Sequence, residues 1–448
     1  MRFRNWMMAG AGALAIGRTA AQQPNVLLIL ADDMGWGDVG FNGCKDIPTP
    51  HIDSIAQNGV IFDAGYVTAP QCGPSRTGLL SGRYQNRCGI EENHTIDEHG
   101  VPPGVRMFGE YMRDAGYRTG MVGKWHQGIG PGLHPLERGF DWFYGFLGGS
   151  SHYLPQGRAQ SIPRIERNRN PQVVTDYLTF VFGERAIEFM RAESDKPFFL
   201  YLSFNAPHGP LQAPKQYLSR FEHLAGAVPP ITRRGQTWEN PRQIYAAMVS
   251  ALDDTIGRVL QALREDGKEE NTIIYFLSDN GGPTKVTSAN NGPLRGVKGD
   301  VLEGGVRVPF AVQWKGTIAA GRRLDVPVSS LDLLPTSLAA SGAAVPALLD
   351  GLNLLPVLQE GVALPKRTLL WRFPYPAEHH VWGIRQGEWK LVDEAVRASQ
   401  GFTGKGITGL YRIHDDAGEC NDLAAQFPEI RQRLLQTYQE GVSEWEQK

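Results

Sequence analysis

The chain contains four short apolar runs, and each ends in a cluster of polar residues. The runs are Asn25–Leu30, Tyr117–Val122, Phe198–Phe204 and Thr272–Leu277. Unbroken apolar runs of this length are typical of strands buried on both faces, as in a parallel sheet covered by helices. Helical patterns accompany them at His51–Asn58, Met107–Ala115, Tyr177–Ala192 and Arg242–Glu265. This alternation predicts an α/β fold with a doubly wound, mostly parallel sheet.

The polar clusters are candidate site residues, because ligands of such sheets bind beyond the carboxyl ends of the strands. Asp32 and Asp33 follow the first run, and Asp279 and Asn280 follow the last. Their oxygens suit Ca²⁺ or Mg²⁺ better than Zn²⁺. Clustered carboxylates would also repel one another without a cation. On these residues alone, two separate Asx-rich turns remain an alternative to a metal site.

Composition narrows the class of protein. The 448 residues include 45 Lys and Arg against 47 Asp and Glu, 53 Gly and only four Cys. This balance is typical of a globular protein and excludes a disordered chain or a disulfide scaffold. It lacks the basic surplus of a nucleic-acid partner. The glycine excess predicts many tight turns and close backbone approaches.

The first residues resemble an export signal. Arg2 and Arg4 precede the apolar run Trp6–Ile16, and small residues follow at Thr19–Ala21. We interpret residues 1–21 as a signal peptide and expect a periplasmic or extracellular protein. An uncleaved N-terminal anchor or a frayed helix is the alternative. The run is too short to span a bilayer, and no later segment is long and apolar enough for a stable membrane span.

The segment around Cys72 is the most informative one. Pro74 and Ser75 are good helix-start residues, so Cys72 is predicted just before a helix N-terminus, one turn from Arg76. Such a place favours anions and an activated thiol, although a structural cysteine is the default for this feature alone. A phosphatase of the Cys-x5-Arg type is excluded, because Gly78 occupies the position of its arginine.

Cys72-x-Pro74-Ser75-Arg76, followed by Leu80-Ser81-Gly82-Arg83, resembles the signature of the formylglycine-dependent (type I, arylsulfatase-like) sulfatases of the alkaline phosphatase superfamily. Further family-like motifs occur in the expected order: Asp32-Asp33, Gly123 to His126, Ala206-Pro207-His208, Ser278 to Gly281 and Arg295 to Lys298. The resemblance implies a large mixed, mostly parallel sheet sandwiched by helices, with a small C-terminal α+β subdomain.

The resemblance also implies the nucleophile and the metal. Cys72 is oxidised to formylglycine by a maturation enzyme, and the hydrated aldehyde attacks the sulfate ester. Ca²⁺, rather than Mg²⁺, is held by residue 72 together with Asp32, Asp33, Asp279 and Asn280. The metal binds a sulfate oxygen and lowers the pKa of the attacking hydroxyl.

The remaining roles are likewise implied by the resemblance. Lys124 and Lys298 bind sulfate oxygens, and Arg76 orients the formylglycine. His208, with Lys298 nearby, protonates the departing alcohol, and His126 takes a proton so that the sulfated aldehyde hydrate collapses and expels sulfate. Ser151 is expected to touch the nucleophile, with a register uncertain by one residue. His152 and Trp125 are expected at the mouth of the site, with core packing as the alternative for Trp125.

A second, smaller unit follows residue 365. Short strand patterns occur at Thr368–Phe373, Trp382–Arg385, Glu388–Val392 and Leu410–Ile413, before an amphipathic helix at Pro428–Trp445. This unit resembles the four-stranded C-terminal subdomain of sulfatases. We therefore expect a catalytic domain over residues 22–365 and a subdomain over residues 366–448. Pro365–Pro376 and His379-His380 either contribute to substrate binding or form a connecting loop.

Taken together, these patterns predict an exported, calcium-dependent sulfuric ester hydrolase that acts on a sulfated carbohydrate. A phosphoric or phosphonic ester hydrolase on the same scaffold is the alternative enzyme. If Cys72 stays unmodified, a non-catalytic protein that binds sulfated glycans is the alternative from another class.

Overall fold

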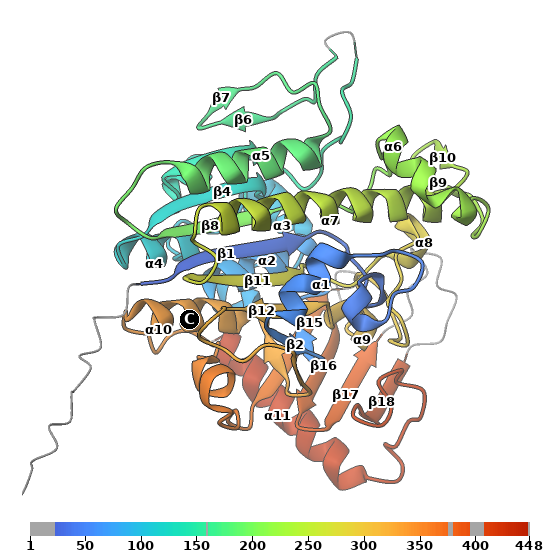
Figure 1. The fold of residues 1–448 in the computed structure, drawn as a ribbon. Coiled ribbons are helices and arrows are strands. Elements are labelled where there is room, and N and C mark those ends of the chain that lie inside the picture. The colour runs from blue at the N-terminus through green and yellow to red at the C-terminus, as the bar shows by residue number, and fades with distance from the viewer. Residues whose placement is uncertain (1–22, 158–159, 375–379, 395–406, 447–448) are drawn as a thin grey trace, which may run out of the picture.

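The computed structural model describes residues 23–157, 160–374, 380–394 and 407–446. The signal peptide predicted at residues 1–21 lies outside these ranges. A ten-stranded sheet forms the centre of the molecule (Figure 1). In spatial order its strands are β13 (Arg322–Leu324), β2 (Val60–Phe62), β12 (Phe310–Gln313), β11 (Thr272–Ser278), β1 (Asn25–Ala31), β8 (Phe198–Ser203), β4 (Arg118–Lys124), β5 (Trp142–Phe146), β6 (Glu166–Arg167) and β7 (Asn170–Pro171).

The four apolar runs form the parallel centre of this sheet. β1 pairs in parallel with β11 on one side and with β8 on the other, and β8 pairs in parallel with β4. Every residue of β8 and β11 is buried, which explains why these sequences do not alternate between apolar and polar. β12 and β6 run antiparallel to their neighbours, so the sheet is mixed. The predicted fold class is confirmed.

Helices cover both faces of the sheet. Leu27 and Ile29 of β1 face one side, where α1 (Pro50–Gln57), α5 (Leu178–Arg191) and α7 (Pro241–Glu265) complete the core. Figure 1 shows α5 and α7 side by side over this face. Val26 and Leu28 face the opposite side, which is covered by helices α2 (Cys72–Ser81), α3 (Asn93–His99), α4 (Phe108–Asp114) and α10 (Leu333–Ser341).

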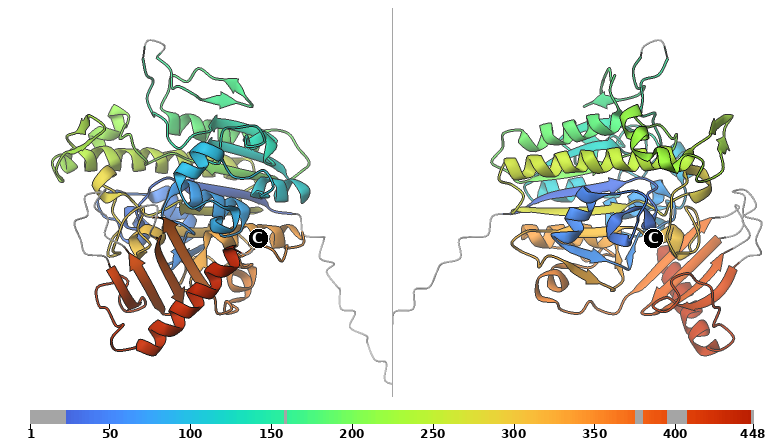
Figure 2. Two further views of the ribbon diagram at one scale, coloured as in Figure 1. Left: turned by 180° about the vertical axis from the view of Figure 1, so that it is seen from behind. Right: turned by 45° about the vertical axis from the view of Figure 1, so that its right-hand side comes forward.

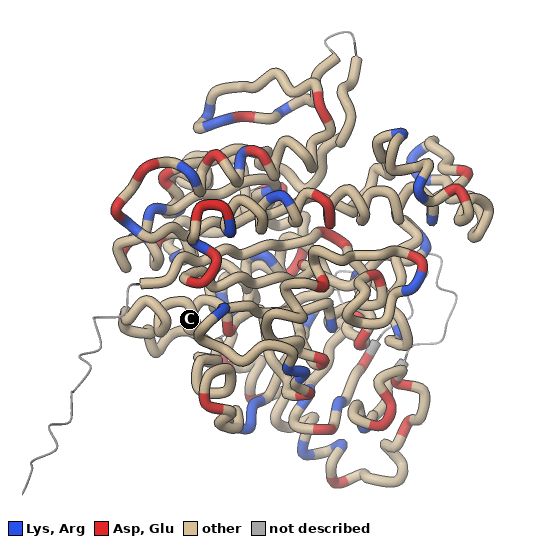
Figure 3. Tube along the Cα trace, in the orientation of Figure 1, with Lys and Arg blue, Asp and Glu red and all other residues tan. Residues whose placement is uncertain are grey.

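The remaining elements are short and lie near the ends of the central strands. They are the pairs β3 (Gly65–Tyr66) with β14 (Val328–Ser329) and β9 (Ile231–Arg233) with β10 (Gln236–Trp238), and the helices α6 (Lys215–Leu218), α8 (Thr284–Thr287) and α9 (Glu303–Val306). Among the described residues, no helix combines the length and the apolar character needed to cross a bilayer. Basic and acidic positions are interspersed over the view in Figure 3, consistent with their near balance in the sequence.

The C-terminal unit is an antiparallel four-stranded sheet with one helix (Figure 2). All its predicted strands and its helix are present, with bounds that differ by a few residues. They are β15 (Thr368–Pro374), β16 (His380–Gln386), β17 (Trp389–Glu394), β18 (Ile407–Arg412) and α11 (Pro428–Glu446). The helix packs on the sheet through Trp382 and Tyr438, whose rings stack with centroids 4.3 Å apart.

Candidate active site

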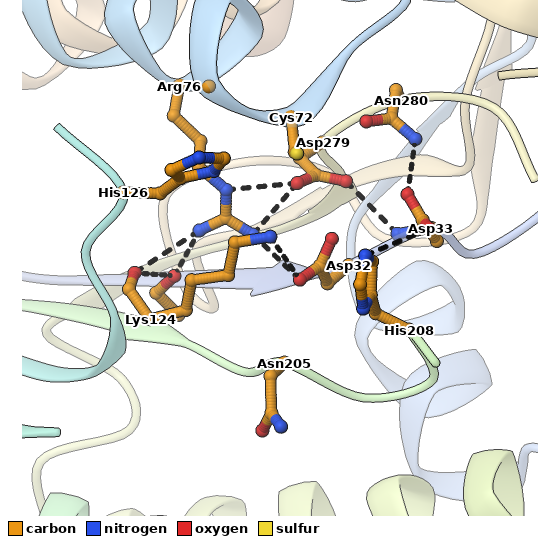
Figure 4. A network of polar contacts seen from close by, with 12 residues as sticks. Asp32, Asp33, Cys72, Arg76, Lys124, His126, Asn205, His208, Asp279 and Asn280 are labelled. Carbon is orange, nitrogen blue, oxygen red and sulfur yellow. Dashed lines mark hydrogen bonds and ion pairs between the residues drawn. The ribbon is translucent and has the colours of Figure 1, made fainter. Parts of the chain in front are cut away.

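The ends of the four central strands bring the predicted polar residues together (Figure 4). Asp32 and Asp33 follow β1, Asp279 and Asn280 follow β11, and His208 lies on the loop after β8. Lys124 is the last residue of β4, with His126 two positions beyond it. Parallel strands present their carboxyl ends at one edge of a sheet, so these residues meet although they are far apart in sequence.

Cys72 enters this edge from the opposite helix layer. It is the first residue of α2, whereas the sequence predicted it just before the helix, and only 2% of its surface is exposed. Its Sγ lies 3.9 Å from Lys298 Nζ and accepts a hydrogen bond from Asn93 Nδ2 at 3.3 Å. Burial alone would raise the pKa of the thiol, but the charges of Lys124, Lys298 and His126 outweigh it and hold that pKa well below its usual value.

Arg76 is fully buried one turn along α2, and its guanidinium is directed at carboxylates rather than at Cys72. Its Nη2 lies 2.8 Å from Asp279 Oδ2 and 3.6 Å from Asp32 Oδ2. Its Nη1 donates to Tyr201 Oη and to the carbonyl oxygen of Lys124. Arg76 therefore ties α2 to the ends of β1 and β11. Arg76 would therefore orient residue 72, as predicted, by holding α2 in place and not by contacting the side chain at position 72.

Both predicted sulfate-binding lysines contact the acidic cluster. Lys124 Nζ lies 2.6 Å from Asp32 Oδ2, and Lys298 Nζ lies 2.6 Å from Asp33 Oδ1. Lys124 is fully buried, whereas 17% of the Lys298 side chain is exposed. The negative charge of Asp33 overcomes the desolvation of Lys298, so the pKa of that ammonium is raised and it stays charged. The site therefore holds two fixed positive charges beside Cys72.

The predicted metal ligands fit a cation. Buried Asp32 Oδ1 and Asn280 Oδ1 have no hydrogen-bond partner within the described part of the chain. Burial and the neighbouring Asp279 raise the pKa of Asp32 well above its usual value. A divalent cation would remove both penalties, because it would be ligated by the two unpartnered oxygens and would neutralise the carboxylates.

The chemical type of the ligand atoms indicates which metal the site suits. Asp33 Oδ1 accepts from Asn280 Nδ2 at 2.7 Å, and the backbone N–H of Asp33 donates to Asp279 Oδ1 at 3.1 Å. All four side chains offer hard oxygen ligands, which suit Ca²⁺ or Mg²⁺. Ligand atoms of Asp32, Asp33 and His208 also lie within 4.8 Å of one another. We favour the oxygen set, because neither Ca²⁺ nor Mg²⁺ prefers imidazole.

His208 lies against the acidic cluster, with Nε2 3.6 Å from Asp33 Oδ2. Burial and the nearby lysines lower its pKa to about 3 despite Asp33, so without substrate the imidazole is neutral. A bound anion adds negative charge and favours its protonation.

His126 is almost fully buried on the other side of Cys72. Neither ring nitrogen has a hydrogen-bond partner among the described residues, although Nε2 lies 3.5 Å from Asp97 Oδ1 on α3. The backbone at His126 has a φ of 53°, and Asp33 has a φ of 63°. Non-glycine residues rarely adopt this left-handed conformation, and it is concentrated at functional sites. Gly149 leaves room for His126, since a Cβ there would lie 2.8 Å from Nε2.

A cleft of about 790 Å³ opens at Cys72. Its lining includes Ser150 and His152 but not Ser151, whose hydroxyl donates to the carbonyl oxygen of His152 at 3.3 Å. Ser150 and not Ser151 therefore lines the cleft, a difference of one residue that the predicted register allowed. Phe373 and Pro374 of β15 also line the cleft, whereas residues 375–379 lie outside the described ranges.

Trp125 does not reach the mouth of this cleft. It is fully buried, donates from Nε1 to the carbonyl oxygen of Leu133 at 2.8 Å, and packs edge-to-face on Phe140. The core-packing alternative for Trp125 is therefore correct, and His152 alone of the pair lies at the mouth.

Sequence reasoning missed Asn93 and Asp97 of α3. Asn93 Oδ1 accepts the backbone N–H of Gly73 at 2.9 Å, and a Cβ at Gly73 would lie only 2.7 Å from that oxygen. The one motif in this stretch is Asn93-His94-Thr95, which matches a glycosylation acceptor. That motif gives no indication of an active-site role. Their position beside Cys72 depends on the packing of α3 against α2 and not on a local pattern.

Comparison with known proteins gives consistent matches. A family model described as Sulfatase matches residues 24–343, and one described as N-sulphoglucosamine sulphohydrolase, C-terminal, matches residues 298–442. N-acetylgalactosamine-6-sulfatase of Mus musculus is 32% identical over 400 residues, covering 82% of this chain and 72% of that protein. Arylsulfatase A of Homo sapiens is 32% identical over 474 residues, covering 95% and 89%.

Solved structures match along nearly the whole chain. Ps i-CgsB in complex with k-i-k-neocarrahexaose superposes with a TM-score of 0.84 at 34% identity, over 94% of this chain and 93% of that one. BT4656 in complex with its substrate D-glucosamine-2-N, 6-O-disulfate superposes with a TM-score of 0.77 over 95% and 99%. At 22% identity the latter match shows the fold alone. The chain belongs to the sulfatase family of the alkaline phosphatase superfamily, and it is a sulfuric ester hydrolase.

Proposed function

We propose that this sulfatase is exported, carries formylglycine at position 72, binds Ca²⁺ and removes sulfate from a sulfated carbohydrate. The observation that carries the proposal is the environment of Cys72. The side chain at this position lies at the cleft, within reach of Lys298 and beside the acidic cluster of Asp32, Asp33, Asp279 and Asn280.

Formylglycine would supply a hydrated aldehyde in place of a thiol, and the cation would withdraw charge from the sulfate. The oxygens of Asp32, Asp33, Asp279 and Asn280 would hold that cation. Lys124 and Lys298 would bind the remaining sulfate oxygens, where negative charge accumulates during sulfur transfer. Because both ammonium groups are already held by carboxylates, they need little reorganisation when the ester binds.

The two histidines would move protons on opposite sides of residue 72. His208, charged once the substrate anion is bound, would donate a proton to the ester oxygen as its bond to sulfur breaks, with the charged Lys298 nearby. His126 would take a proton from the hydroxyl at position 72 that remains after transfer. Asp97 lies close enough to stabilise the resulting imidazolium.

Support for a carbohydrate substrate comes from the relatives. One is named for a sulfated amino sugar, and the structure of Ps i-CgsB contains a carrageenan-type oligosaccharide. The open cleft offers room for sugar units beyond the sulfate. Export is supported by the apolar run that follows Arg2 and Arg4.

Mass spectrometry of the peptide spanning residues 69–76 tests the nucleophile. In protein from a host with a formylglycine-generating enzyme, we expect the mass of formylglycine at position 72. Cysteine alone would overturn the proposed mechanism and favour a glycan-binding protein. Parallel assays with sulfate and phosphate monoesters, titrated with Ca²⁺ and Mg²⁺, test the reaction. Faster hydrolysis of the phosphate ester would favour the phosphoric ester hydrolase instead.

A further inference from the structure

The two walls of the cleft carry opposite charges. On one wall, Glu92 lies at the N-cap of α3 and Asp97 lies on the helix itself. On another, Arg233 and Arg234 lie at the tip of the β9–β10 hairpin. The sulfate-binding lysines do not belong to either wall. The cleft therefore offers positive charge at a second place, away from the lysines beside Cys72.

Both arginines of the hairpin are exposed and available for a ligand. No described residue forms an ion pair or a side-chain hydrogen bond with either guanidinium. Nearby arginines differ in this respect, since Arg220 pairs with Asp254 and Arg242 pairs with Asp38. Adjacent arginines repel each other unless an anion lies between them or water screens them. An anion at this tip would gain from two guanidinium groups that have no competing partner.

The hairpin is fixed relative to the catalytic loop. At its base, Trp238 is 9% exposed and donates from Nε1 to the carbonyl oxygen of Leu211 at 2.9 Å. Leu211 lies three residues after His208 on the same loop. The connection between the hairpin and the reacting groups is therefore short and buried.

The turn itself holds an arginine in an unusual conformation. Arg234 has a φ of 51° and Gly235 a φ of 77°, the two left-handed residues of a tight hairpin turn. Asparagine, aspartate or glycine is preferred at the first of these positions. An arginine stands at this position instead, and it lines the cleft.

We propose that the β9–β10 hairpin is a second anion subsite, which binds a further sulfate or carboxylate of an oligosaccharide whose scissile sulfate lies at residue 72. This inference rests on the proposed function. The acidic wall of α3 repels a second anion, so the substrate chain is oriented toward Arg233 and Arg234. The enzyme then prefers multiply anionic oligosaccharides to sulfated monosaccharides.

Binding to a Cys72→Ala background, which cannot consume its ligand, tests the subsite by calorimetry. The probes are galactose 6-sulfate, k-i-k-neocarrahexaose and a chondroitin 6-sulfate tetrasaccharide. Adding Arg233→Gln and Arg234→Gln should weaken binding of at least one oligosaccharide by about tenfold or more, with less than a twofold change for galactose 6-sulfate. The matched control, Arg431→Gln with Arg433→Gln, removes two exposed charges from α11 and should leave all three affinities unchanged.

Two outcomes would overturn the subsite. One is that the hairpin variant binds both oligosaccharides as tightly as its parent, the Cys72→Ala protein with an unchanged hairpin. The other is a parent that binds neither oligosaccharide more tightly than galactose 6-sulfate. Sulfate release by the unmutated enzyme is measured separately. Hairpin-dependent binding without any sulfate release would overturn the proposed function and leave the subsite standing.

Discussion

At the scale of single residues, the site depends on pairing opposite charges before any substrate arrives. Lys298 pairs with Asp33 at 2.6 Å, and Lys124 and Asp32 repeat the arrangement in full burial. The charge of Asp33 raises the pKa of Lys298, which therefore remains charged although desolvation alone would favour the neutral amine. The positive charges of these lysines also lower the pKa of the Cys72 thiol. In the sequence, only the nearby Arg76 indicated such an environment.

Cys72→Ser separates the two halves of the proposed reaction. Serine offers one hydroxyl, which can accept the sulfuryl group but leaves no second hydroxyl for His126 to deprotonate. We expect a covalent sulfate to persist on the Ser variant, seen as an added mass on the intact protein, whereas Cys72→Ala should show neither adduct nor turnover. Cys44→Ser, away from the cleft, serves as the control with normal turnover. Repeated turnover by the position-72 serine variant would contradict the proposed release step.

Asp97→Asn tests whether Asp97 positions His126. Its carboxylate lies 3.5 Å from Nε2, and the pKa of Asp97 is lowered chiefly by its interaction with His126. Without that charge the imidazolium is less stable, so kcat should fall about tenfold while KM changes less than twofold. The neighbouring Glu98→Gln is the matched control, because Glu98 is exposed and, among the residues that the structure describes, forms ion pairs only with His94 and His99. An unchanged kcat in steady-state assays would remove Asp97 from the mechanism.

At the scale of elements, a buried ionic cluster joins the C-terminal sheet to the active-site loop. Lys390 of β17 lies 2.8 Å from Glu303 of α9 and 2.9 Å from Glu419, and all three side chains are fully buried. Glu303 also accepts from Tyr66 Oη at 2.6 Å. Glu303 lies five positions after Lys298, so the cluster holds the loop that carries this lysine, which we propose binds sulfate.

Lys390→Met should destabilise the protein by about 3–5 kcal/mol, because it leaves two buried carboxylates without their shared cation. The change is measured as the free energy of unfolding in denaturant. Lys366→Met removes an exposed lysine just before β15 and should cost less than about 0.5 kcal/mol. Equal stability of the two variants would show that the cluster does not hold the subdomain.

The same cluster predicts a pH dependence of stability. Burial raises the pKa of Glu419 to about 7, against 4.5 for an ordinary Glu, because Lys390 cannot fully compensate two carboxylates. The folded state thus retains a proton that the unfolded chain loses. The contribution of this group to the free energy of unfolding is complete below about pH 4.5. It disappears as the pH rises through 7, which lowers the free energy of unfolding by about 3 kcal/mol. Between pH 4.5 and 8, Glu419→Gln should abolish this part of the decline in the free energy of unfolding with pH. The same pH dependence in the variant and the unmutated protein would show that Glu419 is not the titrating group.

At the scale of the whole molecule, the proposed cation joins strands that are distant in sequence. Asp32 and Asp33 follow β1, and Asp279 and Asn280 follow β11, about 250 residues later. A ligand that binds only the folded state stabilises it in proportion to the logarithm of its concentration. The cation should therefore act on stability as well as on turnover.

Chelation should lower both the activity and the melting temperature of the protein. Ca²⁺ at 100 times its dissociation constant should restore about 3 kcal/mol to the free energy of unfolding. Scanning calorimetry measures this change. Mg²⁺ should restore less at equal concentration, because it requires a stricter octahedral geometry. In Asp279→Asn the response to Ca²⁺ should shrink, whereas in Asp195→Asn, at an exposed position, it should persist. A melting temperature insensitive to Ca²⁺ would count against the metal site.

The sequence alone determined the parallel centre of the sheet, the order of its helices and most of the residues that the structure brings together around Cys72. The reason is local: burial on both faces requires uninterrupted apolar runs, and parallel strands bring their polar ends to one edge. The four strands of the C-terminal unit were likewise visible as short alternating segments.

The tertiary structure decided what depends on packing between elements. The contacts of Asn93 and Asp97 with the site, the placement of Arg233 and Arg234 on the cleft, and the sharing of Lys390 by two glutamates arise from segments that have no common periodicity. Charge pairs of this kind form wherever folding brings side chains within reach, and no spacing in the chain encodes them.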